Sequence, residues 1–444
     1  MPVSFIPSQL DAPSVAAALT LRDSPSRLLF KDIRLAFRNS HYLPYLFFPL
    51  RIKSGPYDEI TPTRRNSKDV ALHLAIFSLT IGSFGVGARI AYCTSASWVA
   101  LYAAGCWAGL MALAHPLNYG PRILQSKVNL DRYPEHPEEK WIFVNGICAG
   151  TRYLQENLDM ISNIFKRPVT GVHNRSYGII FDLLECLVQR DFSYMTADIR
   201  VVYNEIKIAL MNESIEKVVL LAHSQGGIII STALDALYAD LPPAAWDKLE
   251  IYTFGNAANH FNNPPRCIQC HNGSCNPLPG LPSHPPSNRR QIAVIEHYAN
   301  SKDFVARLGV LQSVKGLPGG NQFVGKVFTR LGEGGHLFCQ HYLGPMFNGI
   351  RPDFLDEVVV PEEDTAIRRA EAGAKNSRDE IEKVSEAEDQ IGDAVGQTVM
   401  EISRLWKYKD GRIPEPALPP SLRRFNSTSS KGSMESDAST VLVD

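Results

Sequence analysis

The segment AHSQGG, residues 222–227, carries residue types suited to nucleophilic catalysis. It directly follows the apolar run KVVLLAH, which is typical of a buried strand, and it leads into GGIIIST, which is typical of a helix. A sharp turn between a strand and a helix presents the side chain at its apex, and small residues two positions before and after it relieve crowding. The pattern therefore predicts that Ser224 is a nucleophile. The alternative is that Ser224 only caps the helix.

A serine nucleophile needs a base, and the base needs an acid that orients it. Asp303 lies just past the apolar segment IAVIEHYANS, so its carboxylate is expected at the carboxyl end of a strand. His336 follows the predicted last strand FVGKVF and the loop GEGG, and it is our preferred base. His341 is the alternative base, and five residues of helix would turn it to a different face. Asp303 can also be a helix cap, and either histidine can merely cap or pack its helix.

The oxyanion of an acyl-transfer reaction is held by backbone N–H groups. Gln225 would supply one, because it opens the predicted helix, where N–H groups have no intrahelical partner. A second donor, from Ile147 or Gly146, is expected in the loop NGICAG, residues 145–150. The glycine allows the backbone to approach a substrate closely.

Strand and helix patterns alternate from Trp141 onward. WIFVNGI, PVTGVHN, KVVLLAH, LEIYTFGNAA and QIAVIEHYANSKD indicate strands, and amphipathic or apolar helical segments separate most of them. Continuous apolar strands that alternate with helices predict an α/β fold, in which a mostly parallel sheet has helices on both faces.

These motifs together resemble a known family. AHSQGG, followed by YTFGNAANHF, HYANSKDFV and GHLFCQHYL, is similar to the α/β-hydrolase fold and, within it, to class 3 lipases and serine esterases. The resemblance covers about residues 140–350 and implies Ser224, Asp303 and His336 as a catalytic triad. The sequence departs from the lipase pattern at Ala222, in the long insert at 262–290 and in the oxyanion loop.

The insert contains Cys267, Cys270, His271 and Cys275. This spacing fits a structural zinc site, a disulfide or, through C-x-x-C-H, haem attachment. A solvated loop is the interpretation we favour. We predict no metal and no organic cofactor, because triad chemistry requires neither.

A nearly uncharged stretch precedes this domain. In the 52 residues from Val70 to Pro121, Arg89 is the only Asp, Glu, Lys or Arg. Segments 70–88 and 98–114 are about 25 to 29 Å long as helices, near the thickness of a bilayer core. They predict a two-helix membrane hairpin at 70–115. A pair of helices buried in a soluble core and a shallow monotopic insertion are the alternatives. Basic residues flank both outer ends, so both termini and the catalytic domain are expected to face the cytosol.

The remaining segments differ in charge. Residues 1–69 hold ten Lys or Arg and six Asp or Glu, and they predict a basic, loosely structured leader without a cleavable signal peptide. Residues 362–406 predict one long, acidic, solvated helix that offers a surface to a protein partner. Residues 408–444 are rich in Pro, Ser and Thr and predict a disordered tail.

The overall composition is that of a folded protein. Of the 444 residues 44% are hydrophobic, and the net charge of −1 gives no basic excess for nucleic-acid binding. We expect a membrane-associated serine hydrolase, a lipase or carboxylesterase that cleaves acyl esters of lipids. An acyltransferase with the same triad and a non-catalytic scaffold with a hydrolase fold are the alternatives.

Overall fold

The structure is a computed structural model, and it describes residues 2–7, 23–50, 55–264, 290–314, 323–348, 353–361, 394 and 396–415. Within these ranges the chain forms one nine-stranded sheet in the order β2-β4-β3-β5-β6-β7-β8-β1-β9. The strands are Val3–Ile6 (β1), Ile123–Gln125 (β2), Glu139–Val144 (β3), Val169–Val172 (β4), Lys217–His223 (β5), Leu249–Phe254 (β6), Val294–Asn300 (β7), Lys326–Arg330 (β8) and Val359–Pro361 (β9).

The central part of the sheet is parallel. Strands β4, β3, β5, β6, β7 and β8 all run in one direction, while β2 and β1 lie antiparallel to their neighbours β4 and β8. The carboxyl ends of six strands therefore meet at one edge of the sheet, which is the edge where Ser224 follows β5.

Helices cover both faces of this sheet. The described helices of the domain are Thr151–Phe165 (α4), Ile179–Phe192 (α5), Ala197–Met211 (α6), Gln225–Asp240 (α7), Phe304–Leu308 (α8), Val310–Ser313 (α9), Phe338–Leu343 (η5, a π-helix), Gly344–Phe347 (α10) and Asp353–Asp356 (α11), with the 3₁₀ turn Pro243–Lys248 (η3). Alternate residues of β3 enter two separate apolar clusters: Ile142 packs with α6 and α7, and Phe143 packs with α4 and η5. The predicted α/β fold is confirmed.

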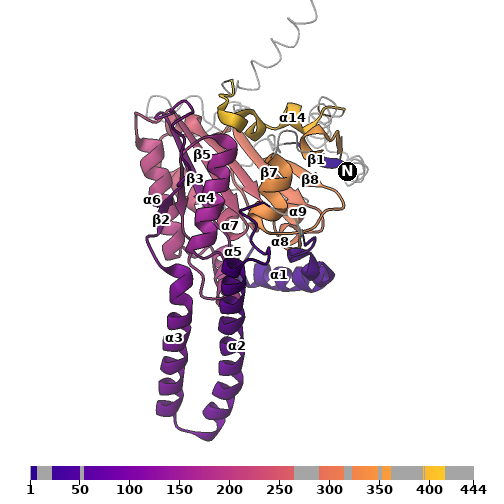
Figure 1. The fold of residues 1–444 in the computed structure, drawn as a ribbon. Helices are drawn as coiled ribbons and strands as arrows, with labels where there is room; N and C mark the ends of the chain where they lie inside the picture. Colours follow the sequence, from indigo (N-terminus) through magenta and orange to yellow (C-terminus); the bar gives the residue numbers. More distant parts are fainter. Residues whose placement is uncertain are drawn as a thin grey trace, which may run out of the picture.

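Two long helices, Arg64–Cys93 (α2) and Ala96–Asn118 (α3), project from the domain as an antiparallel pair (Figure 1). Both are long and apolar enough to cross a membrane, and only 11% and 6% of their most apolar windows are buried. The other described residues therefore leave these windows largely uncovered, which favours the predicted hairpin over a pair of helices buried in a soluble core. Both helices extend beyond 70–88 and 98–114, because the residues toward the domain and those at the tip of the hairpin are helical too.

The prediction of a loosely structured leader is wrong for the part of residues 1–69 that the structure describes. Strand β1 is buried and lies between β8 and β9, and Pro25–Asn39 (α1) and Ser40–Leu46 (η2) are helical. The backbone partners of β1 are more than 300 residues away in the chain. Local composition carries no information about such pairing.

The prediction for the C-terminal region needs a similar correction. Most of 362–406 and the segment 416–444 lie outside the described residues, but Val399–Ile402 (α14) and Leu405–Gly411 (η6) are separate short helices, because the chain is extended at Ser403. Tyr408, expected in a disordered tail, is fully buried and donates a hydrogen bond to Glu250 at 2.7 Å.

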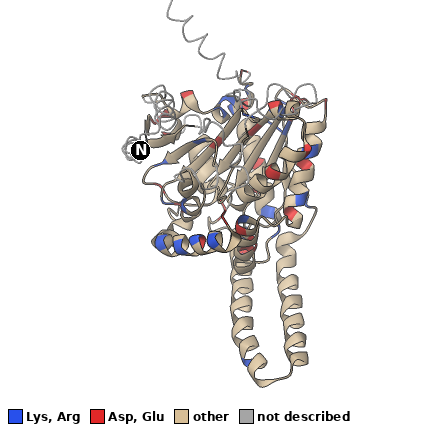
Figure 2. Ribbon diagram, turned by 180° about the vertical axis from the view of Figure 1, so that it is seen from behind, with Lys and Arg blue, Asp and Glu red and all other residues tan. Residues whose placement is uncertain are grey.

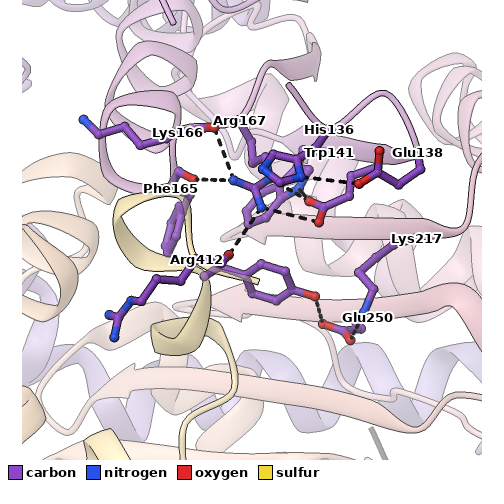
Figure 3. A network of polar contacts seen from close by, with 11 residues as sticks. His136, Glu138, Trp141, Phe165, Lys166, Arg167, Lys217, Glu250 and Arg412 are labelled. Atoms are coloured by element: carbon purple, nitrogen blue, oxygen red, sulfur yellow. Dashed lines mark hydrogen bonds and ion pairs between the residues drawn. The ribbon is translucent and has the colours of Figure 1, made fainter. Parts of the chain in front are cut away.

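This C-terminal segment is fixed to the sheet edge opposite Ser224 (Figure 3). Buried Arg167 pairs with Glu139 at the start of β3 at 2.8 Å, and it also donates to the carbonyl of Arg412. The ring of Tyr408 packs edge-on against Trp141, with 5.2 Å between centroids. These contacts hold η6 against the domain, with Leu405, Trp406, Tyr408 and Lys409 buried.

Candidate active site

Ser224 occupies the sharp turn between β5 and α7, with φ 56° and ψ −122°. Non-glycine residues rarely adopt such a positive φ, and it is retained where the surroundings enforce it. The surroundings here are tight: a Cβ at Gly226 would overlap the carbonyl of Val144, and one at Gly227 would overlap the side chain of Asn256. The glycines of AHSQGG are thus required by packing, and Ser224 is presented at the apex of the turn.

The structure brings together the three residues of the predicted triad. Ser224 Oγ lies 2.8 Å from His336 Nε2, and His336 Nδ1 lies 2.7 Å from Asp303 Oδ2. When Nδ1 donates its hydrogen to the carboxylate, Nε2 carries a lone pair directed at the serine hydroxyl. All three residues are buried. The arrangement can transfer a proton from the hydroxyl to the imidazole.

Asp303 is held from two further sides. Its Oδ1 accepts the N–H of Val305 at 2.8 Å, so it also caps α8, as the alternative interpretation had it. Its Oδ2 accepts the hydroxyl of Tyr342 at 2.5 Å. Burial, and next the neighbouring carboxylate, raise the pKa of Tyr342 well above its ordinary value, so the phenol stays a donor. The sequence analysis did not assign a role to Tyr342. Its position in the HYL segment, close after His336, was the feature that could have suggested one.

His341, the alternative base, contacts other groups. Its Nε2 donates to the carbonyl of Pro49 at 3.0 Å, and its Nδ1 accepts the N–H of Leu337 at 3.1 Å. The geometry therefore favours His336 over His341 as the base that contacts Ser224. His341 connects helix η5 to the segment that follows η2.

The segment 45–49, which follows α1 in the chain, supports the loop that carries His336. The N–H groups of Gly335 and His336 donate to the carbonyls of Tyr45 at 2.7 Å and Leu46 at 3.0 Å. We call residues 45–49 the strap. The strap fixes the backbone of the candidate base, and sequence reasoning gave no indication of it.

His223, the residue before Ser224, lies under His336. Its Nε2 contacts the carbonyl of His336 at 2.7 Å, and the two rings are 4.7 Å apart between centroids. Burial, followed by the neighbouring imidazole of His336, lowers the pKa of His223 well below its ordinary value. His223 is therefore neutral, with Nε2 as the donor.

The loop after β3 lies directly against the nucleophile. A Cβ on Gly146 would be only 2.6 Å from Ser224 Cβ. The side chain of Asn145 orders this loop: it accepts the N–H of Asn174 at 2.8 Å and donates to the carbonyl of Gly146 at 3.1 Å. Gly146, which follows the end of β3, therefore lies beside Ser224, and the oxyanion role of Gly146 or Ile147 stays a prediction.

Gln225 is the first residue of α7, and its buried side chain is fixed. It donates to Gln189 on α5 at 2.9 Å and accepts from the side chain of Asn174. This keeps the N-terminus of α7 in place next to Ser224.

Among the described residues, none beside Ser224 belongs to a cluster that could hold a metal ion. Cys267, Cys270, His271 and Cys275 lie outside the described residues, as does most of the insert 262–290. Within the described ranges, His136, Glu138 and Glu139 are close enough to share an ion, but they lie at the amino end of β3. There Glu139 already binds Arg167 and Trp141. We assign no metal to the site around Ser224.

Comparisons with known proteins add little to this geometry. No family model matches the chain, and no curated protein matches it. Two chains of solved structures match; one, described as the structure of an arylesterase, is 15% identical and covers 53% of this chain and 84% of its own length, with a TM-score of 0.27. Similarity at this level carries no argument about activity.

Proposed function

We propose that this protein is a membrane-associated serine hydrolase that cleaves acyl esters of lipids. The observation that carries the proposal is the continuous hydrogen-bonded chain from Ser224 Oγ through the His336 imidazole to the buried Asp303 carboxylate. Its position at the carboxyl edge of a parallel sheet, on a strained turn into a helix, is also that expected of an α/β-hydrolase nucleophile.

The chemistry follows from the roles of these groups. Ser224 Oγ attacks the acyl carbonyl while His336 Nε2 takes its proton; the same proton then passes to the departing alcohol as the acyl-enzyme forms. Water, activated by the same imidazole, attacks the acyl carbon, and the carboxylic acid leaves as Ser224 regains its proton. Asp303 orients His336 and stabilises the imidazolium.

The tetrahedral intermediates need donors on the side of Ser224 that faces Gly146. The N–H of Gln225, at the start of α7, and the N–H of Ile147 or Gly146 are the proposed donors. Removal of one such donor typically lowers the rate 10²- to 10³-fold.

The hairpin supports a lipid substrate because it is attached at the edge that carries the site. Asn118, the last residue of α3, exchanges two hydrogen bonds with Ser176 in the loop after β4, at 2.7 and 3.0 Å. Thr151, at the start of α4, donates to the carbonyl of Leu117 at 3.1 Å. If α2 and α3 are inserted, Ser224 faces the bilayer on the cytosolic side, the side that the flanking basic residues favour.

The test compares the purified full-length protein with Ser224→Ala and Ser193→Ala in vesicles that contain a long-chain ester. The wild type and Ser193→Ala should release free fatty acid, and Ser224→Ala should not. Equal release by Ser224→Ala would contradict the proposal. Product analysis with an added alcohol separates hydrolysis from acyl transfer, and release of the protein by alkaline carbonate would contradict insertion of the hairpin. Binding of a protein partner by 362–406 stays a prediction.

A further inference from the structure

Helix α1 presents three different stripes along its length. Its inward stripe is buried or half-buried against the domain, and the opposite stripe is apolar yet exposed. Basic residues form a third stripe beside the apolar one, at successive positions one helical turn apart. The inward stripe is Leu28, Asp32, Leu35 and Asn39, the apolar stripe is Phe30, Ile33 and Phe37, and the basic stripe is Arg27, Lys31, Arg34 and Arg38.

The apolar stripe is far more exposed to solvent than the apolar face of a helix in a soluble protein usually is. Phe30 and Phe37 are 68% and 77% exposed. A helix with an exposed apolar face bordered by Lys and Arg is typical of helices that lie in the plane of a membrane interface.

Helix α1 lies where such an interface would be. It packs against α5 and α8 and runs across the direction of the hairpin, at the level where α2 and α3 leave the domain (Figure 1). Its basic residues form a row along the helix in the opposite view (Figure 2). The ion pair of Asp32 with Arg190 on α5, at 2.6 Å, fixes α1 to the domain. Because α1 packs against α5 and α8, and α8 lies on the domain side of α1 in Figure 1, the exposed apolar stripe faces away from the domain.

Helix α5 continues this surface up to the hairpin. Its outer residues Leu183 and Leu184 are exposed. At its start, Phe181 packs edge-on against Trp107 of α3, at 6.2 Å between centroids, and Gly178 contacts Ile76 of α2. Ile76 is six residues, or about 9 Å, further along α2 than Val70, where the uncharged stretch begins. The start of α5 therefore reaches the level of the apolar part of the hairpin.

The inner side of α5 lies beside the candidate active site. Gln189 accepts the hydrogen bond from Gln225, the residue after Ser224. Asp182 accepts the N–H of Cys148, in the loop of residues 145–150, at 3.0 Å. One helix, about 10 Å across, thus separates the neighbourhood of Ser224 from the exposed face of α5.

We propose that the outer faces of α1 and α5 lie in the headgroup layer of an anionic bilayer, and that the ester substrate enters the site from that bilayer past α5. A lipid surface is the occupant because α5, which contacts both α1 and α2, connects the apolar stripe to the apolar hairpin, and because the row beside the stripe is basic. Arg34 and Arg38 make no ion pair with any other described residue, so anionic headgroups are the natural partners of their charge. Both parts of the proposal rest on the inserted hairpin of the proposed function; the membrane-facing surface is independent of the reactivity of Ser224, whereas the entry route also rests on hydrolysis at Ser224.

Photocrosslinking in the full-length, membrane-bound protein tests this surface. A benzophenone amino acid replaces Phe37, Phe84 near the far end of α2, or Ile208 on α6, which is 65% exposed. With alkyne-tagged phosphatidylserine in the membrane, positions 37 and 84 should form lipid adducts and position 208 should not. Lipid labelling at 84 alone would overturn the surface proposal and leave the hairpin intact. Labelling at neither position would overturn both, and a protein adduct at 37 would assign the surface to a protein partner instead.

A functional measurement tests the entry route. Phe30→Ser combined with Phe37→Ser removes two exposed side chains, so folding should be unaffected. Hydrolysis of an ester embedded in anionic vesicles should fall at least about tenfold, while hydrolysis of a soluble short-chain ester and labelling of Ser224 by a fluorophosphonate stay the same. The control pair Ile208→Ser and Met211→Ser should have no effect. Equal loss on both substrates, or no loss on vesicles, would overturn the route.

Discussion

Gly146→Ala tests how closely the loop after β3 approaches the nucleophile. The added methyl group would lie 2.6 Å from Ser224 Cβ and 3.1 Å from Oγ. Carbon atoms in contact are normally about 3.5 Å or more apart, so Ser224 or the loop must move by about 1 Å. A displacement of that size at a reacting group lowers the rate about 100-fold. The backbone N–H is retained, so the loss would report position rather than the removal of a donor.

The assay is kcat for a soluble p-nitrophenyl ester, with the melting temperature measured in parallel. Gly105→Ala in α3 is the matched control, because a Cβ there meets nothing within 4 Å. We expect a loss of about 100-fold in kcat for Gly146→Ala and none for the control. Wild-type kcat in a folded Gly146→Ala protein would refute the contact between this loop and a catalytic Ser224.

Three further perturbations test the groups around the triad. Tyr342→Phe removes a hydrogen bond to the Asp303 carboxylate at a fully buried position, so kcat should fall about tenfold with the fold retained; an unchanged kcat would contradict a positioning role. His341→Ala removes one contact of the strap and should lower kcat severalfold, whereas His336→Ala should lower it at least about 10³-fold; the reverse order would make His341 the base. Glu59 is a buried residue whose carboxyl oxygens accept the N–H groups of Cys339 and Gln340 in η5, the helix after His336. Burial raises the pKa of Glu59 from 4.5 to about 7, so the folded state retains a proton that the unfolded state loses. The free energy of unfolding should therefore fall by about 3 kcal/mol as the pH rises from about 4.5 to about 7, and Glu59→Gln should remove this dependence in melting curves.

The local part of the site could be predicted from the sequence. The turn that carries Ser224 is encoded within a dozen residues, because an apolar strand, small residues and an apolar helix follow one another directly. Asp303 was predicted for a similar reason, since it lies just past an apolar strand. Placing Ser224 and Asp303 at one edge then required only that the strands be parallel.

The contacts that position the base could not be predicted in this way. The strap reaches the loop of His336 from almost 300 residues earlier in the chain, and the choice between His336 and His341 depends on it. The same holds for β1, whose place in the sheet depends on β8 and β9, and for Tyr408, whose burial depends on Glu250 and Trp141. The composition of a short stretch of sequence indicates whether that stretch tends to be exposed to solvent or buried. It does not indicate which distant part of the chain will pack against it.

The central claim is that Ser224 is an activated nucleophile, and covalent labelling tests it most directly. Folded full-length protein is treated with a fluorophosphonate, and the adduct is located by peptide mass spectrometry in the wild type, Ser224→Ala and His336→Ala. The account predicts a single adduct on Ser224 in the wild type and none in either variant. Absence of an adduct on Ser224 in folded wild-type protein, or equal labelling after His336→Ala, would contradict it.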